Sequence, residues 1–468
     1  MSTLFFDLSG FRRYLAAHGH LSGIQRVNLM VLAHTAERLG RERVAAAFLD
    51  FGTGAHHALP LTEAPEVLTD LTALARALGL TDAQGRRLPT LAPYIDRAGP
   101  YRFHKAIRRL NAALGKERHF RRRGSSRAAW RAALKGPTGP VRTRFETLQS
   151  RARPGDTLLA LDAAWGEPRI PAMHRAAHAA GLRVVPLIHD LCPLLTPQFF
   201  PRLNGQRFED WLAGTTEHAD LFLAISRATA ADLRGVLHAR GCTTPVREVP
   251  LAQARLALPG APSATTAPAK AATATRAAMS DRVASLSARP FALCVGTLEI
   301  RKNLWTLAQA WDRLRADPSL DVPRLVFAGR PGWLNEDFDR LMQATGGLGG
   351  WARVIDGPSD DELDQLYRAC QFHICVSLKE GWGLPIGEAL AYGKTGVVSG
   401  VSSMPEVGGD LVEYCDPTSI ASVEAACRKL IADPARRTAL EARIAAADLR
   451  DWGAVADDLI AALGAARR

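Results

Sequence analysis

One stretch in the second half of the chain decides the fold, and it reads Lys379-Glu380-Gly381-Trp382-Gly383-Leu384-Pro385-Ile386-Gly387-Glu388-Ala389-Leu390. It follows the apolar run Phe372–Ser377, which predicts a buried strand, and Pro385 suits the first turn of a helix. Gly381 and Gly383 allow the backbone to approach a ligand closely. A helix N-terminus presents unpaired N–H groups and a positive dipole end, so the stretch predicts a strand–turn–helix unit that binds a phosphate.

The two acidic residues of this stretch have different expected positions. Glu380 lies in the loop before the helix and Glu388 lies about one turn inside it, so one carboxylate can reach a sugar ring while the other reaches a ribose diol. The glycines depart from the Gly-x-Gly-x-x-Gly pattern because Gly387 falls one residue late, and no strand-end acid follows at about 20 residues. A dinucleotide site is therefore disfavoured.

A second strand-to-helix junction, at 295–303, reads Val-Gly-Thr-Leu-Glu-Ile-Arg-Lys-Asn. Its adjacent Arg301 and Lys302 are well placed to neutralise a diphosphate leaving group. A lone Arg-Lys pair in a loop is more commonly a solvated surface pair. The position of this pair one half-domain before the Glu380 loop favours the binding role.

Short apolar runs alternate with helical periodicity in both halves of the chain. The expected strands are Thr3–Leu8, Arg43–Phe51, Thr157–Asp162, Arg183–Ile188, Asp220–Ile225, Phe291–Val295, Arg324–Ala328, Arg353–Ile355 and Phe372–Ser377. The expected helices include Gly23–Leu39, Ala228–Ala239, Asn303–Ala316, Asp360–Cys370, Pro385–Tyr392, Ser419–Ala432 and Pro434–Ala446. The fold class is therefore α/β, with two Rossmann-like doubly wound domains that face each other across a cleft.

The bulk composition fits an ordinary globular enzyme. The chain has 468 residues, enough for two or three domains, with 47% hydrophobic and 23% charged residues. No apolar run reaches the roughly 18 residues of a membrane span, and the start of the chain lacks the basic region of a signal peptide. Seven scattered cysteines without a Cys-x-x-Cys pair argue against a disulfide framework and a zinc site, which favours the reducing cytoplasm.

The positive charge is concentrated in one segment. Between Arg102 and Lys135 there are twelve Lys/Arg and one acid, Glu117, whereas the whole chain carries a net charge of only +12. Interleaved apolar residues make this a basic amphipathic stretch that suits an anionic bilayer surface or an anionic lipid-linked acceptor. A solvated basic helical insertion explains it equally well. Nucleic-acid binding is disfavoured because no recognised nucleic-acid-binding motif is present.

The motifs resemble the family-4 retaining glycosyltransferases of the GT-B fold, also called glycosyl transferases group 1. The resemblance rests on Glu380-x7-Glu388 with the intervening Gly-Trp-Gly-Leu-Pro, and on the preceding Gly-Thr-Leu-x-x-Arg-Lys-Asn, a form most similar to mannosyltransferases that use GDP-mannose. It is specific over about 290–410, patchy over 1–250, and absent from the basic segment. Two positions depart from the family pattern: Thr297 stands where many relatives have arginine, and Gly23 stands alone where many have a glycine pair.

The resemblance implies a role for each matching residue. Glu380 would contact the transferred sugar and, with His189, form the catalytic group; Glu388 would hold the ribose. Arg301 and Lys302 would bind the diphosphate of the donor, and the remaining donor-binding positions would be Gly383, Leu384 and Gly23. Front-face attack assisted by the leaving phosphate would then need no metal and no cofactor, because cationic side chains neutralise the leaving group. The adjacent acids Asp360 and Asp361 precede a helical pattern and are expected to serve the helix N-terminus instead of a metal.

The expected organisation has four parts. An N-terminal acceptor-side domain covers 1–253 and includes the basic insertion at about 101–136; a low-complexity linker covers 254–289. A nucleotide-sugar-binding domain covers 290–450, and a C-terminal helix covers 451–468. The expected function is transfer of a hexose, with GDP-mannose as the best donor, to a glycan or lipid-linked acceptor in surface polysaccharide synthesis, with nucleic acid excluded as a partner. Cytoplasmic localisation is expected, and the basic segment leaves peripheral attachment to the inner membrane face open.

Two other functions remain open. A sugar-nucleotide epimerase can share two facing domains of this kind. A non-catalytic module that binds a nucleotide sugar or an anionic lipid is the other, although such a module would have no need for Glu380, Glu388, Arg301 and Lys302 together.

Overall fold

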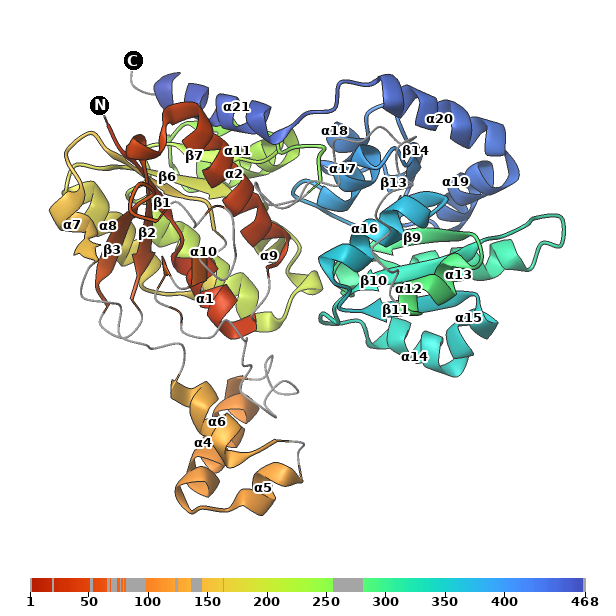
Figure 1. Ribbon diagram of the computed structural model, residues 1–468, viewed down its shortest axis with the longest axis horizontal. Coiled ribbons are helices and arrows are strands. Elements are labelled where there is room, and N and C mark those ends of the chain that lie inside the picture. Colours follow the sequence, from red (N-terminus) through yellow and green to blue (C-terminus); the bar gives the residue numbers. More distant parts are fainter. Residues whose placement is uncertain are drawn as a thin grey trace.

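Two α/β domains, each built on one largely parallel sheet, make up the body of the protein (Figure 1). The computed structural model describes residues 2–18, 21–50, 54–64, 98–122, 125–135, 145–162, 164–255 and 281–465, with a few positions between 68 and 80. The prediction of an α/β fold with two doubly wound domains is confirmed.

The C-terminal sheet has the strand order β11-β10-β9-β12-β13-β14, and every strand pair is parallel. Counted from its first strand, this is the order 3-2-1-4-5-6 of a doubly wound sheet, whose ligands bind where the order reverses. The reversal lies between β9 and β12, the strands that precede the two motif loops. The strands are β9 (Phe291–Val295), β10 (Arg324–Gly329), β11 (Ala352–Asp356), β12 (Phe372–Cys375), β13 (Gly396–Ser399) and β14 (Glu413–Cys415).

Helices cover both faces of this sheet because its central strands are largely apolar and buried on both sides. Ser359 and Glu362 form a reciprocal capping box that begins α16, so the cap is Ser359, and Asp360 and Asp361 supply favourable charge in the first turn. The helical segments are η6 (Ile300–Lys302), α13 (Leu304–Arg315), α14 (Glu336–Ala344), α15 (Gly346–Gly350), α16 (Asp360–Ala369), α17 (Leu384–Ala391), α18 (Met404–Gly408), α19 (Ile420–Ala432) and α20 (Pro434–Ala446).

The N-terminal sheet has the order β4-β3-β2-β1-β5-β6-β7-β8. The six strands from β2 to β8 in this order are parallel, and β3 and β4 add an antiparallel edge that the sequence analysis missed. Only two residues of β3 are buried, so its periodicity is weak. The strands are β1 (Leu4–Asp7), β2 (Val44–Leu49), β3 (His56–Pro60), β4 (Glu146–Thr147), β5 (Thr157–Ala160), β6 (Arg183–Ile188), β7 (Phe222–Ala224) and β8 (Val246–Glu248).

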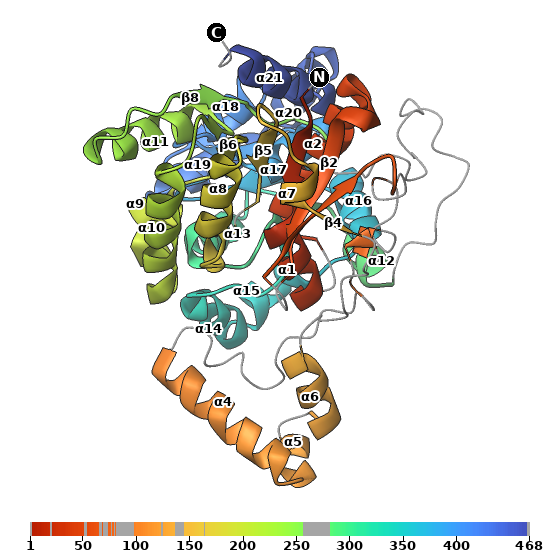
Figure 2. The same cartoon turned by 90° about the vertical axis from the view of Figure 1, so that its left-hand side faces the viewer.

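The helices of this domain flank its sheet (Figures 1 and 2). They are α1 (Ser9–His18), α2 (Gly23–Leu39), η1 (Arg41–Arg43), α7 (Leu148–Arg151), η4 (Ala164–Gly166), α8 (Ile170–Ala179), α9 (Cys192–Leu195), η5 (Pro197–Phe199), α10 (Arg202–Thr216) and α11 (Arg227–Ala239). Two of them, α2 and α11, extend toward the C-terminal domain and position residues of the candidate site.

The basic segment folds into three helices, α4 (Ala98–Ala113), α5 (Glu117–Arg121) and α6 (Arg127–Lys135), which we call the basic helical module. Phe120 and Trp130 form its small core, with ring centroids 6.1 Å apart and both side chains fully buried. Figures 1 and 2 both show the module standing away from the two sheets. None of the helices that the structure describes is long and apolar enough to cross a membrane.

Two segments near the expected domain boundaries are helical: one lies inside the expected linker, and the other is the expected C-terminal helix. Part of the expected linker forms helix α12 (Asp281–Ser287), because Val283 and Leu286, three residues apart, are buried in a cluster with residues of β9, β10 and α16. The C-terminal helix α21 (Trp452–Ala465) crosses back and packs on α2 of the N-terminal domain. Most of the expected linker, 256–280, lies outside the described residues.

Apolar packing of α21 is expected to contribute to the stability of the N-terminal domain. Leu459 is almost fully buried in the core of that domain, so Leu459→Ala should lower the free energy of unfolding in urea by about 2–4 kcal/mol through lost burial and a residual cavity. Ile460→Ala, next in the helix but only partly buried, is the matched control and should cost clearly less. Equal losses in the two variants would contradict the packing of α21 on this domain.

Candidate functional site

The two motif loops meet because β9 and β12 are neighbours in the sheet. The backbone N–H of Leu378 donates to the carbonyl of Arg301 at 2.9 Å and joins the loops directly. The buried amide of Asn303 donates to the carbonyls of Val376, at 3.1 Å, and Pro417, at 2.7 Å. The loop after β9 is therefore held against the end of β12.

A buried carboxylate lies between two cations at this junction. Glu380 Oε2 is 2.6 Å from Arg301 Nη1, and Glu380 Oε1 is 2.5 Å from Lys302 Nζ. The Arg301 guanidinium also donates to the carbonyl of Lys379 at 2.6 Å. Three residues that the sequence analysis selected from two separate loops thus form one charged cluster.

The charge states of this cluster follow from its pairing. Burial alone would raise the pKa of Glu380, but Arg301 and Lys302 outweigh it and lower that pKa to about 2. Burial likewise opposes the charge of Lys302, and the attraction of Glu380 leaves its pKa above the ordinary value. All three groups are therefore ionised at neutral pH.

Glu299 is a second buried carboxylate at the site, and the sequence analysis did not single it out. Its Oε1 accepts from Arg301 Nη2 at 2.6 Å, and burial raises its pKa. Among the described residues, neither Glu299 Oε2 nor Arg301 Nε has a hydrogen-bond partner. The only signal in the sequence was the two-residue spacing from Arg301, which a loop turn can bring together.

The N-termini of two helices from different domains face each other next to the charged cluster. Gly383, with φ of 104°, is the N-cap of α17 in a left-handed conformation that favours glycine, and Leu384 begins the helix. Gly23 begins α2, and a Cβ at Gly23 would lie 3.0 Å from a methyl carbon of Leu384. The positive ends of two helix dipoles therefore converge on one region, which suits an anion.

Glu388 lies in a separate polar group and is not part of the charged cluster. The Tyr367 hydroxyl donates to Glu388 Oε2 at 2.7 Å. Burial raises the pKa of Glu388, and that effect exceeds the lowering by the Tyr367 hydrogen bond and by Arg26. Arg26 of α2 pairs with Asp360 of α16, so the N-terminal domain contributes a charge beside Glu388.

His189 lies at the end of β6, on the N-terminal side of the junction. Its Nε2 is 2.6 Å from the carbonyl oxygen of Leu161, and since a carbonyl only accepts, Nε2 carries the proton and Nδ1 is free to accept. Burial lowers the pKa of His189. The imidazole is therefore neutral at pH 7.

The backbone of His189 contacts the Glu380 loop directly. A Cβ at Gly381 would lie only 1.9 Å from the carbonyl oxygen of His189, so a larger residue cannot occupy this position without a shift of the two domains. The Thr229 hydroxyl bridges the same point, 3.4 Å from the His189 carbonyl and 3.3 Å from the Gly381 carbonyl. Gly381 is therefore required for close approach of the two domains.

Glu406 also joins the domains, in a role that its sequence did not reveal. Its carboxylate accepts from the backbone N–H groups of Arg227, at 2.9 Å, and Ala228, at 2.8 Å, which are the first residues of α11. An acid from the C-terminal domain thus caps a helix of the N-terminal domain. Lys379 Nζ, 2.7 Å from Asp232 of α11, adds an ion pair across the same interface.

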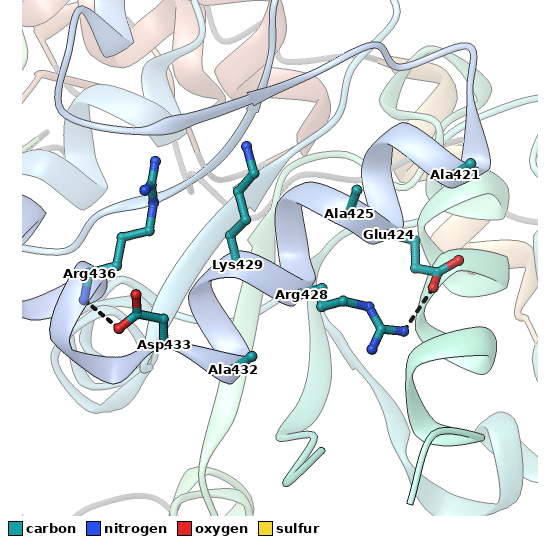
Figure 3. Close-up of a pocket in the computed structure, with 8 residues that line it drawn as sticks. All are labelled: Ala421, Glu424, Ala425, Arg428, Lys429, Ala432, Asp433 and Arg436. Atoms are coloured by element: carbon teal, nitrogen blue, oxygen red, sulfur yellow. Dashed lines mark hydrogen bonds and ion pairs between the residues drawn. The ribbon is translucent and has the colours of Figure 1, made fainter. Parts of the chain in front are cut away.

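A shallow groove elsewhere on the C-terminal domain holds none of the predicted site residues. Figure 3 shows that it runs along α19 and the start of α20. Its cations are paired with acids: Arg428 with Asp317 at 2.5 Å, and Arg436 with Glu413 at 2.6 Å. These ion pairs connect elements within the domain. Within the described ranges, no three or more His, Cys, Asp or Glu residues are grouped to hold a metal ion.

Comparison with known proteins finds a family match in the C-terminal domain and several relatives of the chain. Residues 276–446 match the family of glycosyl transferases group 1. O-antigen chain mannosyltransferase B of Escherichia coli is 35% identical over 153 residues, 33% of this chain and 40% of that enzyme. GDP-mannose:cellobiosyl-diphosphopolyprenol alpha-mannosyltransferase of Xanthomonas campestris is 33% identical over 184 residues, 37% of this chain and 48% of the relative. The chain thus spans less than half of the length of these curated relatives.

Solved structures match the chain over almost its whole length. Anabaena Alr3699/HepE in complex with UDP and glucose has a TM-score of 0.56 at 14% identity, covering 99% of this chain and 100% of that one. Sucrose-phosphate synthase from Thermosynechococcus elongatus has a TM-score of 0.56 at 15% identity, with 98% of each chain covered. At such identities the likeness establishes the fold, and the expected GT-B architecture is confirmed.

Ionisation of Glu380 should stabilise the fold in a pH-dependent way. Its pKa of about 2 lies below the ordinary value of 4.5, so the stabilisation of about 3 kcal/mol is complete above pH 4.5 and is lost as pH falls toward 2. In urea unfolding at pH 6, the free energy of unfolding of wild type should exceed that of Glu380→Gln by about that amount. The difference between the two free energies should become smaller below pH 5. Glu63→Gln, which breaks an exposed pair with Arg151, is the matched control and should cost under about 1 kcal/mol. A gap that stays constant from pH 6 to 3.5 would contradict the assignment.

A side chain at Gly381 should force the domains apart. Gly381→Ala brings a methyl group against the His189 carbonyl, and the expected cost is about 1–3 kcal/mol of unfolding free energy with a larger radius of gyration in X-ray scattering. Gly235→Ala is the matched control, because Gly235 lies inside α11 with open space around its Cβ position, and alanine should be neutral or stabilising there. Unchanged scattering and stability in Gly381→Ala would show that the contact is not tight.

Proposed function

Because the C-terminal domain belongs to the glycosyl transferases group 1 family, we propose that the protein is a retaining mannosyltransferase that uses GDP-mannose. It transfers the sugar to a glycan or lipid-linked acceptor. The observation that carries the proposal is the convergence of Arg301, Lys302 and Glu380 beside two helix N-termini, at the strand-order reversal of a doubly wound sheet.

The cations are the groups that would bind the diphosphate of the donor. Arg301 and Lys302 both pair with the Glu380 carboxylate, and a diphosphate that enters between α2 and α17 would compete for the same two cations. Backbone N–H groups at Gly383 and Leu384 would add hydrogen bonds. Binding of the donor would therefore free Glu380 from its ion pairs and make its carboxylate available to the sugar.

The chemistry follows from charge stabilisation. Departure of the nucleoside diphosphate concentrates negative charge beside Arg301 and Lys302, while the sugar carbon acquires positive charge that the Glu380 carboxylate would stabilise. Neutral His189 would accept a hydrogen bond at Nδ1 from a sugar hydroxyl. The bond from the sugar carbon to the phosphate oxygen breaks, the acceptor hydroxyl attacks from the same face and passes its proton to the departing phosphate oxygen, so the anomeric configuration is retained. The cationic side chains take the neutralising role that a metal has in other transferases.

The Glu388 and Tyr367 pair would recognise the ribose of the donor. The Tyr367 hydroxyl fixes one carboxylate oxygen of Glu388 at 2.7 Å, which leaves lone pairs for a vicinal diol. Arg26 beside Glu388 favours the ionised form that accepts both diol hydroxyls. A tyrosine that positions the ribose ligand was not expected from the sequence.

The choice of mannose as the transferred sugar and GDP as the nucleotide rests on the names of the relatives. The Xanthomonas campestris relative is named for GDP-mannose and a diphosphopolyprenol-linked acceptor, and the Escherichia coli relative is an O-antigen mannosyltransferase. Both names support mannose as the transferred sugar, and the O-antigen name supports a surface glycan as the product class.

The donor can be tested by calorimetric titration of GDP, UDP and ADP, followed by hydrolysis of the matching nucleotide sugar with and without excess EDTA. GDP is expected to bind most tightly. Arg301→Gln and Glu388→Gln should each weaken GDP binding by about 10–100-fold, the range for a lost charge-assisted hydrogen bond. Arg315→Gln is the matched control, since Arg315 forms an exposed pair with Asp312 in α13. Slow hydrolysis of GDP-mannose is expected, with unmodified mannose as the sugar product.

Each alternative has a distinct outcome in this experiment. Release of a C2-epimerised sugar would show that the protein is an epimerase and not a transferase. Tight binding of the nucleotide sugar without any hydrolysis would favour a binding module. Preference for UDP or ADP would overturn the choice of donor. Loss of hydrolysis with EDTA would overturn metal independence, and the configuration of the first glycosylated acceptor tests retention.

A further inference from the structure

Helix α4 of the basic helical module has two opposite faces. Arg108 and Ala112, one helical turn apart, are buried, and the Arg131 side chain of α6 donates to the carbonyl of Ala112 at 2.9 Å, so this face packs against the rest of the module. On the other side, residues 103, 107, 110 and 114 recur at helical spacing and are all apolar. We call these four residues, Phe103, Ile107, Leu110 and Leu114, the apolar stripe.

The apolar stripe is largely exposed. Phe103 is 63% exposed, Leu110 59% and Leu114 57%, the three highest values among the large apolar side chains that the structure describes. The core of the module lies on the opposite face of α4, so the module cannot cover these side chains itself. Exposed apolar residues gathered on one helix face indicate a surface that a partner covers.

Exposed cations accompany the apolar stripe in the same module. Arg109 is exposed on α4, and Lys116, Arg118 and Arg122 line a hollow next to Asn111 and Glu117. Glu117 is engaged by Arg127, whose backbone N–H donates to it at 3.1 Å. Within the described part of the chain, Lys116, Arg118 and Arg122 form no ion pair, so the hollow is strongly cationic.

The combination selects one kind of partner. A second copy of the chain would bring another module with twelve Lys/Arg and one acid against the first, and like charges at such density repel. A nucleic acid would satisfy the cations and leave the aliphatic side chains of the stripe, Ile107, Leu110 and Leu114, in water. An anionic bilayer provides phosphates at its surface and acyl chains a few ångströms below, so it satisfies both features.

We propose that the basic helical module docks the protein on an anionic phospholipid bilayer. Phe103, Leu110 and Leu114 insert below the headgroups, and Lys116, Arg118 and Arg122 bind lipid phosphates. The module belongs to the N-terminal domain, so docking brings that domain to the surface where a lipid-linked acceptor would lie. The docking itself does not depend on the proposed reaction.

Vesicle flotation of the full-length protein tests the docking. We expect binding to vesicles of phosphatidylcholine with phosphatidylglycerol, at least tenfold weaker binding to phosphatidylcholine alone, and weaker binding as salt rises, since roughly a fivefold gain is expected for each cation at an anionic surface. The variants Phe103→Ser/Leu110→Ser/Leu114→Ser and Lys116→Gln/Arg118→Gln/Arg122→Gln should each lose at least about tenfold.

Matched controls change the same chemistry elsewhere on the surface. Trp305→Ser/Leu334→Ser/Val354→Ser removes three exposed apolar side chains, and Arg247→Gln/Arg289→Gln/Arg353→Gln removes three exposed charges. Both controls should bind vesicles like wild type. Thermal unfolding of the module variants should match that of wild type, since the changed side chains are exposed.

The outcomes separate this proposal from the proposed function. The docking proposal would be overturned if wild-type protein does not bind anionic vesicles, or if the module variants bind them as strongly as wild type. So would a stripe variant that only converts a dimer to a monomer in sedimentation, because the partner would then be a second copy. Donor hydrolysis without vesicles should be unchanged in the module variants. Absence of hydrolysis in every protein would count against the transferase and leave the vesicle result standing.

Discussion

The ionised carboxylate of Glu380 between Arg301 and Lys302 is the interaction on which the site depends. A charge this deeply buried is tolerated only when it is paired, and its partners come from a loop 78 residues away in the sequence. The side chain of Asn303 and the backbone hydrogen bond from Leu378 to Arg301 hold the two loops next to each other in space. The same interaction fixes where Gly381 and the N-terminus of α17 lie. The positions that face the N-terminal domain are thus set by the ion pairs behind them.

Approach of the two domains depends in turn on that loop. The His189 carbonyl lies against the backbone of Gly381, Glu406 caps α11, and α2 begins beside Leu384. These are short-range contacts between backbone and small or polar groups, and they tolerate little change in distance. Helix α21 adds a different connection, since it returns from the C-terminal domain and is buried on α2. The junction therefore combines precise polar contacts with one apolar connection that holds the domains together at a distance from the site.

The two proposed kinds of recognition would belong to two different parts of the protein. In the proposed function, the domain junction would offer buried charges and helix N-termini to a small anionic donor, where low dielectric strengthens each contact. In the proposed docking, the basic helical module would offer exposed cations and apolar side chains to an extended surface, where many weak contacts add up. The module stands away from both sheets, so the charged groups at the junction come from the two domains themselves, among them Arg301, Lys302 and Arg26.

The sequence by itself determined the local elements and the chemistry of the loops. Continuous apolar runs predicted Arg183–Ile188 and Phe291–Val295 with their observed bounds, and helical periodicity did the same for Gly23–Leu39 and Pro434–Ala446. The glycines, the proline and the charged residues around Glu380 and Arg301 identified both motif loops, because turn chemistry and helix termini depend on neighbouring residues. Only the tertiary structure decided which loops meet. Four features depend on residues that are far apart along the chain, so no local periodicity could predict them. They are the contact of Tyr367 with Glu388, the capping of α11 by Glu406, the burial of Glu299 and the packing of α21 on the N-terminal domain. Strand order brings such residues together, and that order follows from the packing of the whole sheet.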